Sequence, residues 1–283
     1  MSIKLPVPPK NPTAPIPAPP GMARPHFLAL AVGKMGSGKT TTAASYVKAL
    51  RDAGSFNRVF LISPTYFSNR HLWAWIPCDP SDCFTELSQA GEALQEIVRR
   101  IKAAHLAYKT NAAHWEAHEK HTRGGVLTHQ ERVMLEQMGP PLSRLELIRP
   151  CVILDDLQST QMFNSSAFKS LVLRMRHVCH DPQVGLSFVV LCQSLKNGFP
   201  RALRSCVSLW FLFATRDTTV IKDIAQELSG RISPEEFTRM FEYATDPSAP
   251  GNEHAYMCID LTQGGDLTFR RKLVEPLRPA DFR

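Results

Sequence analysis

The feature that most constrains the fold of this chain is the stretch GKMGSGKT, which runs from Gly33 to Thr40. It matches the phosphate-binding pattern G-x-x-x-x-G-K-[ST] at every fixed position. The apolar run FLALAV (27–32) precedes it, and a segment of helical pattern follows and ends at Gly54. Such a loop works between a buried strand and a helix, because loop amides and the helix N-terminus face the phosphates together. The stretch therefore predicts an α/β fold with a nucleotide site.

Two side chains of this loop have predicted roles of their own. We expect Lys39 to reach the β and γ phosphates of ATP, and the hydroxyl of Thr40 to bind Mg²⁺. The predicted nucleotide-binding residues are Gly33, Lys34, Met35, Gly36, Ser37, Gly38, Lys39, Thr40 and Thr41.

A second motif, CVILDD (151–156), is a buried strand that ends in two carboxylates. The carboxyl ends of parallel strands form the ligand-binding edge of such sheets. We expect Asp155 to serve as the Mg²⁺ carboxylate, directly or from the second shell, and Asp156 to orient or deprotonate an attacking water. The motif is weak alone and strong beside a phosphate-binding loop.

Three more polar residues are candidates for catalysis. Gln193 follows another buried strand (186–193), where its amide can hold the water or sense the γ-phosphate. Arg201 and Arg204 lie on a turn after Pro200, and either can neutralise transition-state charge across a subunit boundary, with a slight preference for Arg204. A strand-end cap for Gln193 and solvent-exposed positions for the arginines are the structural alternatives.

Strand-like and helical patterns alternate along the chain, which is typical of α/β proteins. The five expected core strands are 27–32, 58–63, 151–156, 186–193 and 206–215, and 255–273 is expected to form a C-terminal β-hairpin. A helical insertion of about 78–147 separates the second and third strands, with one helix over 84–108 and another that begins at a capping box of Thr128 and Glu131. A basic helix is expected over about 165–178, and a later helix opens at Ser233 and Pro234.

The ends of the chain suggest the domain organisation. Residues 1–25 hold nine of the 22 prolines, which predicts an extended, mobile arm, either a flexible leader or a docking peptide for another protein. Residues 26–283 form the expected nucleotide-binding domain.

Composition limits the location and the partners. No stretch approaches the roughly 18 apolar residues of a membrane helix. The N-terminus lacks the apolar block of a signal peptide, so we expect a protein that is not secreted. Seven scattered cysteines indicate free thiols in a reducing compartment rather than a disulfide framework. The formal net charge of +7 favours a polyanionic partner.

The combination of GKMGSGKT, VILDD, a fourth strand that ends in Gln193, and PRALRS resembles the HerA–FtsK superfamily of P-loop ATPases. The similarity, which covers about residues 27–275, is closest to the DNA-packaging ATPases of large nucleocytoplasmic DNA viruses, virophages and Polinton-like elements. The resemblance implies a RecA-like core with the strand order 5-1-4-3-2. It also implies a homo-oligomeric ring in the virion or the host cell, where ATP hydrolysis pulls double-stranded DNA into a preformed capsid built of capsid proteins. Many cellular members carry glutamate at the position of Asp156, so the carboxylate of this chain is one methylene shorter than theirs.

Other functions remain open from the residues alone. A P-loop small-molecule kinase, a DNA helicase and a nucleotide-binding structural component of the virion use the same loop. Basic residues that offer sequence-independent contacts to DNA backbone are Lys169, Arg174, Arg176 and His177 in one segment and Arg270, Arg271 and Lys272 in another.

Overall fold

One β-sheet of nine strands organises the part of the chain that the computed structural model describes, which is residues 16–76, 78–181, 184–215, 217–248 and 254–283. The strands are β1 (Leu28–Val32), β2 (Arg58–Ile62), β3 (Cys83–Phe84), β4 (Pro150–Asp155), β5 (Ser187–Cys192), β6 (Leu209–Phe213), β7 (Tyr256–Asp260), β8 (Phe269–Arg271) and β9 (Glu275–Pro276). Their order is β3-β2-β4-β5-β1-β6-β7-β8-β9.

The five predicted strands are adjacent, parallel and in the expected order, since 5-1-4-3-2 corresponds to β6-β1-β5-β4-β2. The sheet extends beyond this prediction at both edges. Strand β3 pairs in parallel with β2 on one side, and β7, β8 and β9 continue in antiparallel pairing from β6 on the other. The predicted C-terminal hairpin is thus confirmed as β7 and β8, and it enlarges the sheet instead of standing apart from it.

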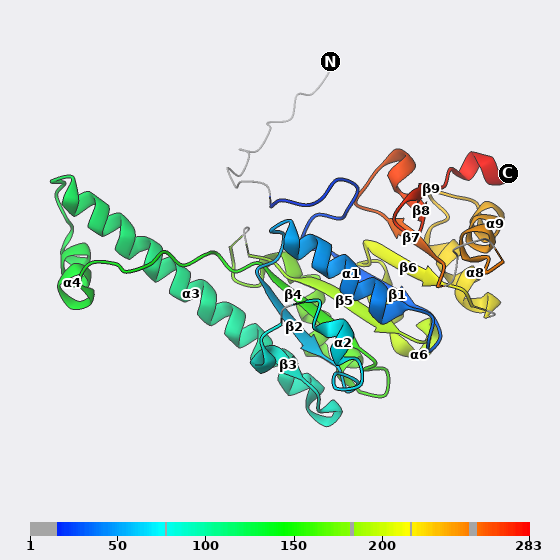
Figure 1. Cartoon of the computed structure of the whole chain (residues 1–283), viewed down its shortest axis with the longest axis horizontal. Coiled ribbons are helices and arrows are strands. Elements are labelled where there is room, and N and C mark those ends of the chain that lie inside the picture. Colours follow the sequence, from blue (N-terminus) through cyan, green and yellow to red (C-terminus); the bar gives the residue numbers. More distant parts are fainter. Residues whose placement is uncertain (1–15, 77, 182–183, 216, 249–253) are drawn as a thin grey trace, which may run out of the picture.

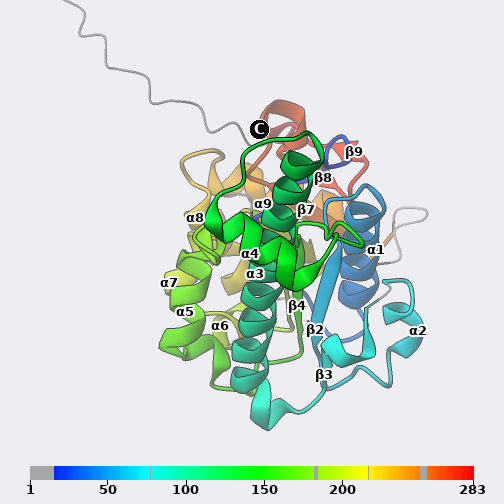
Figure 2. The same cartoon turned by 90° about the vertical axis from the view of Figure 1, so that its left-hand side faces the viewer.

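Helices cover both faces of the sheet, so the fold has three layers (Figures 1 and 2). They are α1 (Lys39–Asp52), α2 (Arg70–Trp73), α3 (Ala90–Thr122), α4 (His129–Met138), α5 (Ser166–Leu173), α6 (Leu195–Gly198), α7 (Arg201–Arg204), α8 (Thr218–Glu227) and α9 (Pro234–Thr245). Alternate residues of each strand point to opposite faces. In β1, Ala29 and Ala31 pack in the core under α1, whereas Leu28 and Leu30 pack in the core shared by α3, α5, α8 and α9.

Capping side chains fix several helix starts as predicted. Thr128 and Glu131 form a capping box at α4, and Ser233 and Glu236 form one at α9. The basic helix is shorter than expected, since α5 ends at Leu173 and a 3₁₀ turn follows.

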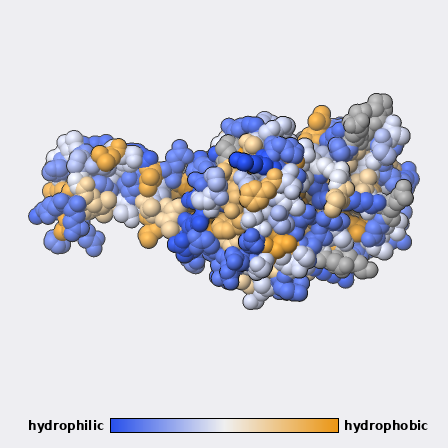
Figure 3. Space-filling model, turned by 60° about the horizontal axis from the view of Figure 1, so that its bottom comes forward, coloured by the Kyte–Doolittle hydropathy of each residue, from blue (hydrophilic) through white to orange (hydrophobic). Residues whose placement is uncertain are grey.

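Helix α3 is longer than the apolar spacing predicted, since it continues past Tyr108 to Thr122. Its first turns pack on the sheet through residues such as Ile97 and Ile101, and its second half leaves the body as a projection (Figures 1 and 3). We call residues 105–147 the antenna. The returning chain holds it there, because His114 Nε2 lies 2.7 Å from the carbonyl oxygen of Gly139 and Lys120 forms a 2.9 Å ion pair with Glu131. The second half of α3 is thus held by these polar contacts and does not need the regularly spaced apolar residues of a helix that packs on a core.

The predicted N-terminal arm divides into two parts. Residues 1–15 lie outside the described residues. From residue 16 the chain lies against the body, where the Ala23 amide donates to the Tyr46 hydroxyl at 3.0 Å and the Ser55 hydroxyl donates to the carbonyl of Pro17 at 2.5 Å. Residues 17–23 are therefore attached to the domain instead of belonging to a free arm.

Across the described residues, no helix combines the length and the apolar character required to cross a membrane.

Candidate nucleotide site

The phosphate-binding loop follows β1 and leads directly into α1, as its motif predicts. Two glycines meet steric demands that other residues do not. A Cβ atom on Gly33 would lie 2.6 Å from Cβ of Phe213, and Gly38 has φ of 94°, in the left-handed region. The N-terminus of α1 adds the positive end of the helix dipole to the loop amides. The loop therefore has the shape and the polarity of an anion cradle.

Lys39 is the buried cation of this loop, with 7% of its surface exposed. Its ammonium donates hydrogen bonds of 2.7 Å to the carbonyl oxygens of Gly33 and Lys34. Burial lowers the pKa of Lys39, and the nearby carboxylates of Asp156 and Asp155 act in the opposite direction. The lysine is thus held inside the loop, and its contact with the β and γ phosphates stays a prediction.

Asp155 is a buried carboxylate at the end of β4, with 2% of its surface exposed. Its Oδ2 accepts hydrogen bonds from the hydroxyls of Ser63 at 2.9 Å and Thr65 at 3.1 Å. Burial raises the pKa of Asp155, while these two hydroxyls and Lys39 lower it. The carboxylate is therefore oriented by its neighbours on the β2 side, and its second oxygen is not used by these bonds.

Asp156 and Gln193 meet beside it. Nε2 of Gln193 donates to Oδ1 of Asp156 at 3.0 Å. Asp156 has φ of 53°, which turns its side chain out of the strand direction just after β4 ends. The structure thus brings together the two residues that the sequence predicted to handle water.

One cavity of about 370 Å³ brings Lys39 together with Asp155, Asp156 and Gln193, whereas the predicted residues Gly33 and Lys34 do not line it. The predicted residues that line it are Met35, Gly36, Ser37, Gly38, Lys39, Thr40, Thr41, Asp155, Asp156 and Gln193. Sequence reasoning missed five others, which are Thr65, Ser68, Asn69, Leu72 and His254. Thr65 lies two residues after the predicted strand 58–63, at the sheet edge where ligands bind, so a signal for it existed. His254 had none, since it reaches the loop only through the fold: a Cβ atom on Gly38 would lie 2.9 Å from Cβ of His254.

The residues present fit a magnesium-bound nucleotide. Mg²⁺ prefers oxygen ligands, and the Thr40 hydroxyl and the Asp155 carboxylate line the same cavity. The hydroxyl of Ser37 is buried in the loop and has no hydrogen-bond partner among the residues that the structure describes, so it can donate to a phosphate oxygen. The assignments of Thr40 and Asp155 to the metal stay predictions.

The two candidate arginines lie elsewhere, around a separate cavity of about 420 Å³. Arg204 is only 6% exposed, and its guanidinium donates to the carbonyl of Leu195 at 3.0 Å and pairs with Asp223 at 3.5 Å and Glu227 at 3.7 Å. Arg201 is exposed on α7. The exposed arginine is therefore the better placed of the two to reach a neighbouring subunit, which reverses the order of preference from the sequence.

The second predicted basic segment, residues 270–272, includes one arginine that the fold buries. Arg270 is 3% exposed, donates to the carbonyl of Gly21 at 2.5 Å and lies 3.6 Å from the buried carboxylate of Asp260. It is a core residue, so it does not offer a contact to a DNA backbone.

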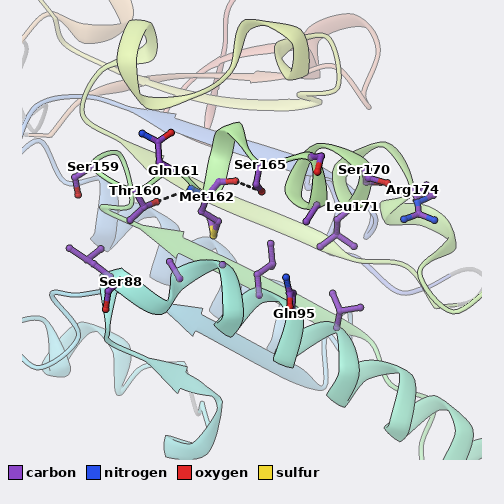
Figure 4. A pocket seen from close by; sticks show the side chains of 17 residues that line it. Ser88, Gln95, Ser159, Thr160, Gln161, Met162, Ser165, Ser170, Leu171 and Arg174 are labelled. Atoms are coloured by element: carbon purple, nitrogen blue, oxygen red, sulfur yellow. Dashed lines mark hydrogen bonds between the residues drawn. The ribbon is translucent and has the colours of Figure 1, made fainter.

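A larger cavity, of about 1070 Å³, lies on the other face of the sheet, between the first turns of α3 and the chain that follows β4. Figure 4 shows Ser88 and Gln95 on its α3 side and Thr160, Met162 and Arg174 opposite them. It shares no lining residue with the 370 Å³ cavity at the phosphate-binding loop, which we call the phosphate cavity.

Comparison with known proteins gives structural similarity only. No protein-family model matches the sequence, and no curated protein matches it either. The structure is similar to that of the genome packaging NTPase B204 from Sulfolobus turreted icosahedral virus 2 in complex with ATP-gammaS, with a TM-score of 0.48 and 12% identity over 90% of this chain and 100% of that one. B204, the DNA-packaging ATPase from Sulfolobus turreted icosahedral virus, gives a TM-score of 0.47 and 10% identity over the same shares.

The cytoplasmic domain of the Thermomonospora curvata type VII secretion ATPase EccC gives a TM-score of 0.38 and 18% identity over 84% of this chain and 24% of that one. None of these similarities assigns a role to a residue of this chain.

Proposed function

We propose that this chain is an ATP hydrolase that drives double-stranded DNA into a viral capsid. The observation that carries the hydrolase part is the meeting, in one cavity, of the loop lysine, a hydroxyl-bound carboxylate and a second carboxylate held by a glutamine. A protein that only binds the nucleotide needs no more than the loop lysine and the loop amides. The paired Asp156 and Gln193 are the additional groups that hydrolysis requires, since water has to be oriented at the γ-phosphate.

Each residue then has a chemical task. The loop amides and Lys39 bind the β and γ phosphates, and Thr40 and Asp155 hold Mg²⁺, which supplies charge neutralisation on the phosphates. Asp156 accepts the proton of the attacking water, and Gln193 fixes the direction of the Asp156 carboxylate. An arginine of a neighbouring subunit, Arg201 in preference to Arg204, adds positive charge at the transition state.

The DNA part of the proposal is supported by the net charge of +7 and by the sequence motifs that resemble packaging ATPases. The same resemblance supports a homo-oligomeric ring and a capsid partner. A small-molecule kinase has less support, because an acceptor has to lie beside the γ-phosphate and the large second cavity has no wall in common with the phosphate site.

The test of hydrolysis is the variant Lys39→Ala, compared with Lys48→Ala. Lys48 lies on the same helix with its side chain 42% exposed and paired with Asp52, so it is a matched control for the loss of one lysine. We expect Lys39→Ala to abolish ATP turnover and Lys48→Ala to retain it. Normal turnover in Lys39→Ala would overturn the site, and nucleotide binding without any turnover in the unaltered protein would favour a structural component.

The test of the substrate is stimulation of turnover. Blunt duplex DNA is expected to accelerate ATP hydrolysis in a salt-sensitive manner, whereas nucleosides are not. Phosphoryl transfer to a nucleoside would instead identify a kinase. Strand displacement without translocation on blunt duplex would identify a helicase.

A further inference from the structure

Two cysteines lie in contact at the β3 edge of the sheet. Sγ of Cys83 is 3.5 Å from Sγ of Cys78, and both residues are half-buried. Cys78 Sγ also donates to the carbonyl oxygen of Val59 at 2.9 Å, which holds it against β2. Among the described residues, no group of three or more cysteines, histidines and carboxylates is arranged so that it could hold a metal ion.

The two thiols differ in acidity in a way that favours exchange chemistry. The contact with the Cys78 thiol lowers the pKa of Cys83, and the Tyr66 hydroxyl acts in the same direction. The same contact and burial raise the pKa of Cys78. Because the thiolate is the nucleophile in thiol–disulfide exchange, Cys83 attacks first and Cys78 is the resolving thiol.

We propose that Cys78 and Cys83 are a redox modification site that closes to an internal disulfide by exchange with a small-molecule disulfide. The Cys83 thiolate attacks one sulfur of the oxidant and forms a mixed disulfide, and the first small thiolate leaves and takes up a proton. Cys78 then loses its proton and attacks Sγ of Cys83, which releases the second small thiol. Two protein thiols are oxidised by two electrons, and one disulfide is reduced to two thiols.

The site lies next to the groups that orient Asp155. Cys83 pairs with Leu61 in the sheet, and the following residue, Phe84, accepts a 2.9 Å hydrogen bond from the Ser63 amide. The Ser63 hydroxyl in turn donates to Asp155. A disulfide between Cys78 and Cys83 is therefore adjacent in sequence to Phe84. The Phe84 backbone is hydrogen-bonded to Ser63, and Ser63 orients the Asp155 carboxylate.

The test uses the full chain, oxidised glutathione and peptide mapping. The sequence has no lysine or arginine from residue 71 to 98, so trypsin leaves both cysteines on one peptide, 71–99. After oxidation we expect this peptide to be about 2 Da lighter and to accept no alkylating reagent, and reduction should restore two alkylation sites. The half-buried single cysteines provide matched controls, so Cys179→Ser and Cys206→Ser should leave the result unchanged.

The single variants test the order of attack. In Cys78→Ser the mixed disulfide on Cys83 cannot be resolved, so we expect glutathione to stay attached to Cys83. Cys83→Ser should react more slowly, since burial of the remaining thiol limits access of the oxidant and still raises its pKa. The proposal is wrong if the unaltered protein keeps two alkylatable thiols in peptide 71–99, or keeps a stable glutathione adduct there, while other cysteines are oxidised.

Discussion

Asp156 and Gln193 are 37 positions apart in the chain, yet the glutamine amide donates a 3.0 Å hydrogen bond to the aspartate carboxylate. The sheet brings them together. Strands β4 and β5 are parallel neighbours with Asp155 opposite Leu191, so the residues just after both strands emerge at the same edge. The pair lies in the phosphate cavity, and this is where the chemistry of water attack is expected.

Replacing the glutamine tests this pair. We expect Gln193→Ala to lower ATP turnover by about 10- to 100-fold, because a carboxylate without its orienting neighbour samples unproductive directions. Nucleotide affinity should change little, since the loop and Lys39 are intact. The measurement is steady-state turnover with separate nucleotide titration, and Gln161→Ala, in the second cavity, is the control. An unaltered turnover in Gln193→Ala would show that the hydrogen bond has no catalytic part.

Asp155 gives a prediction about stability and pH. Burial raises its pKa, so the folded protein binds this proton more tightly than the unfolded chain does. The stability contributed by the protonated form is complete below the unfolded pKa, of about 3.9, and is lost as the pH rises through the folded pKa. Without nucleotide or magnesium, Asp155→Asn should therefore gain stability relative to the unaltered protein as the pH rises from 4 to 8.

Thermal unfolding at the two pH values measures this difference. Asp52→Asn, at an exposed position of α1, is the control for an aspartate outside the site. A relative stability of Asp155→Asn that falls as the pH rises would contradict the assigned cost of the buried charge. Turnover by Asp155→Asn should be lost at every pH, because the carboxylate for the metal is absent.

The loop glycine Gly38 gives a prediction about backbone shape. An alanine there has to adopt φ near 94° and places its Cβ 2.9 Å from His254. We expect Gly38→Ala to lower the free energy of unfolding by about 1–3 kcal/mol and to weaken nucleotide binding. The control is Gly91→Ala in α3, where a Cβ meets nothing within 4 Å, and it should stabilise the protein by up to about 1 kcal/mol. Equal effects in chemical denaturation would refute the steric argument.

The two candidate arginines are expected to have different roles, with Arg204 acting in stability and Arg201 in catalysis. Arg204→Ala leaves Asp223 and Glu227 without their cation, so we expect a lower melting temperature. Arg201→Ala should leave the melting temperature unchanged and reduce turnover. Mixing Arg201→Ala with Lys39→Ala subunits should restore part of the activity, because in the proposed ring a mixed assembly contains sites with an intact loop and a neighbouring arginine. No recovery on mixing, with a normal melting temperature, would argue against an arginine supplied between subunits.

The sequence by itself determined the parts of this protein that depend on neighbouring residues. The loop GKMGSGKT, the strand that ends in Asp155 and Asp156, and the capping boxes at Thr128 and Ser233 follow from local patterns, because backbone geometry and helix capping act over a few residues. The order of the five core strands came from the family resemblance and agrees with the sheet.

Only the tertiary structure decided which distant side chains meet. The placement of His254 on the loop and the burial of Arg204 depend on how the fold brings together segments that are apart in the chain. The contact of Cys78 with Cys83 joins residues only five apart, and it depends on the pairing of β3 with β2. The length of α3 was missed because the antenna is held by polar contacts to its own return segment, which leave no apolar period in the sequence. Local sequence patterns predict whether a segment forms a helix or a strand. The burial of a side chain and its contacts are properties of the packed chain.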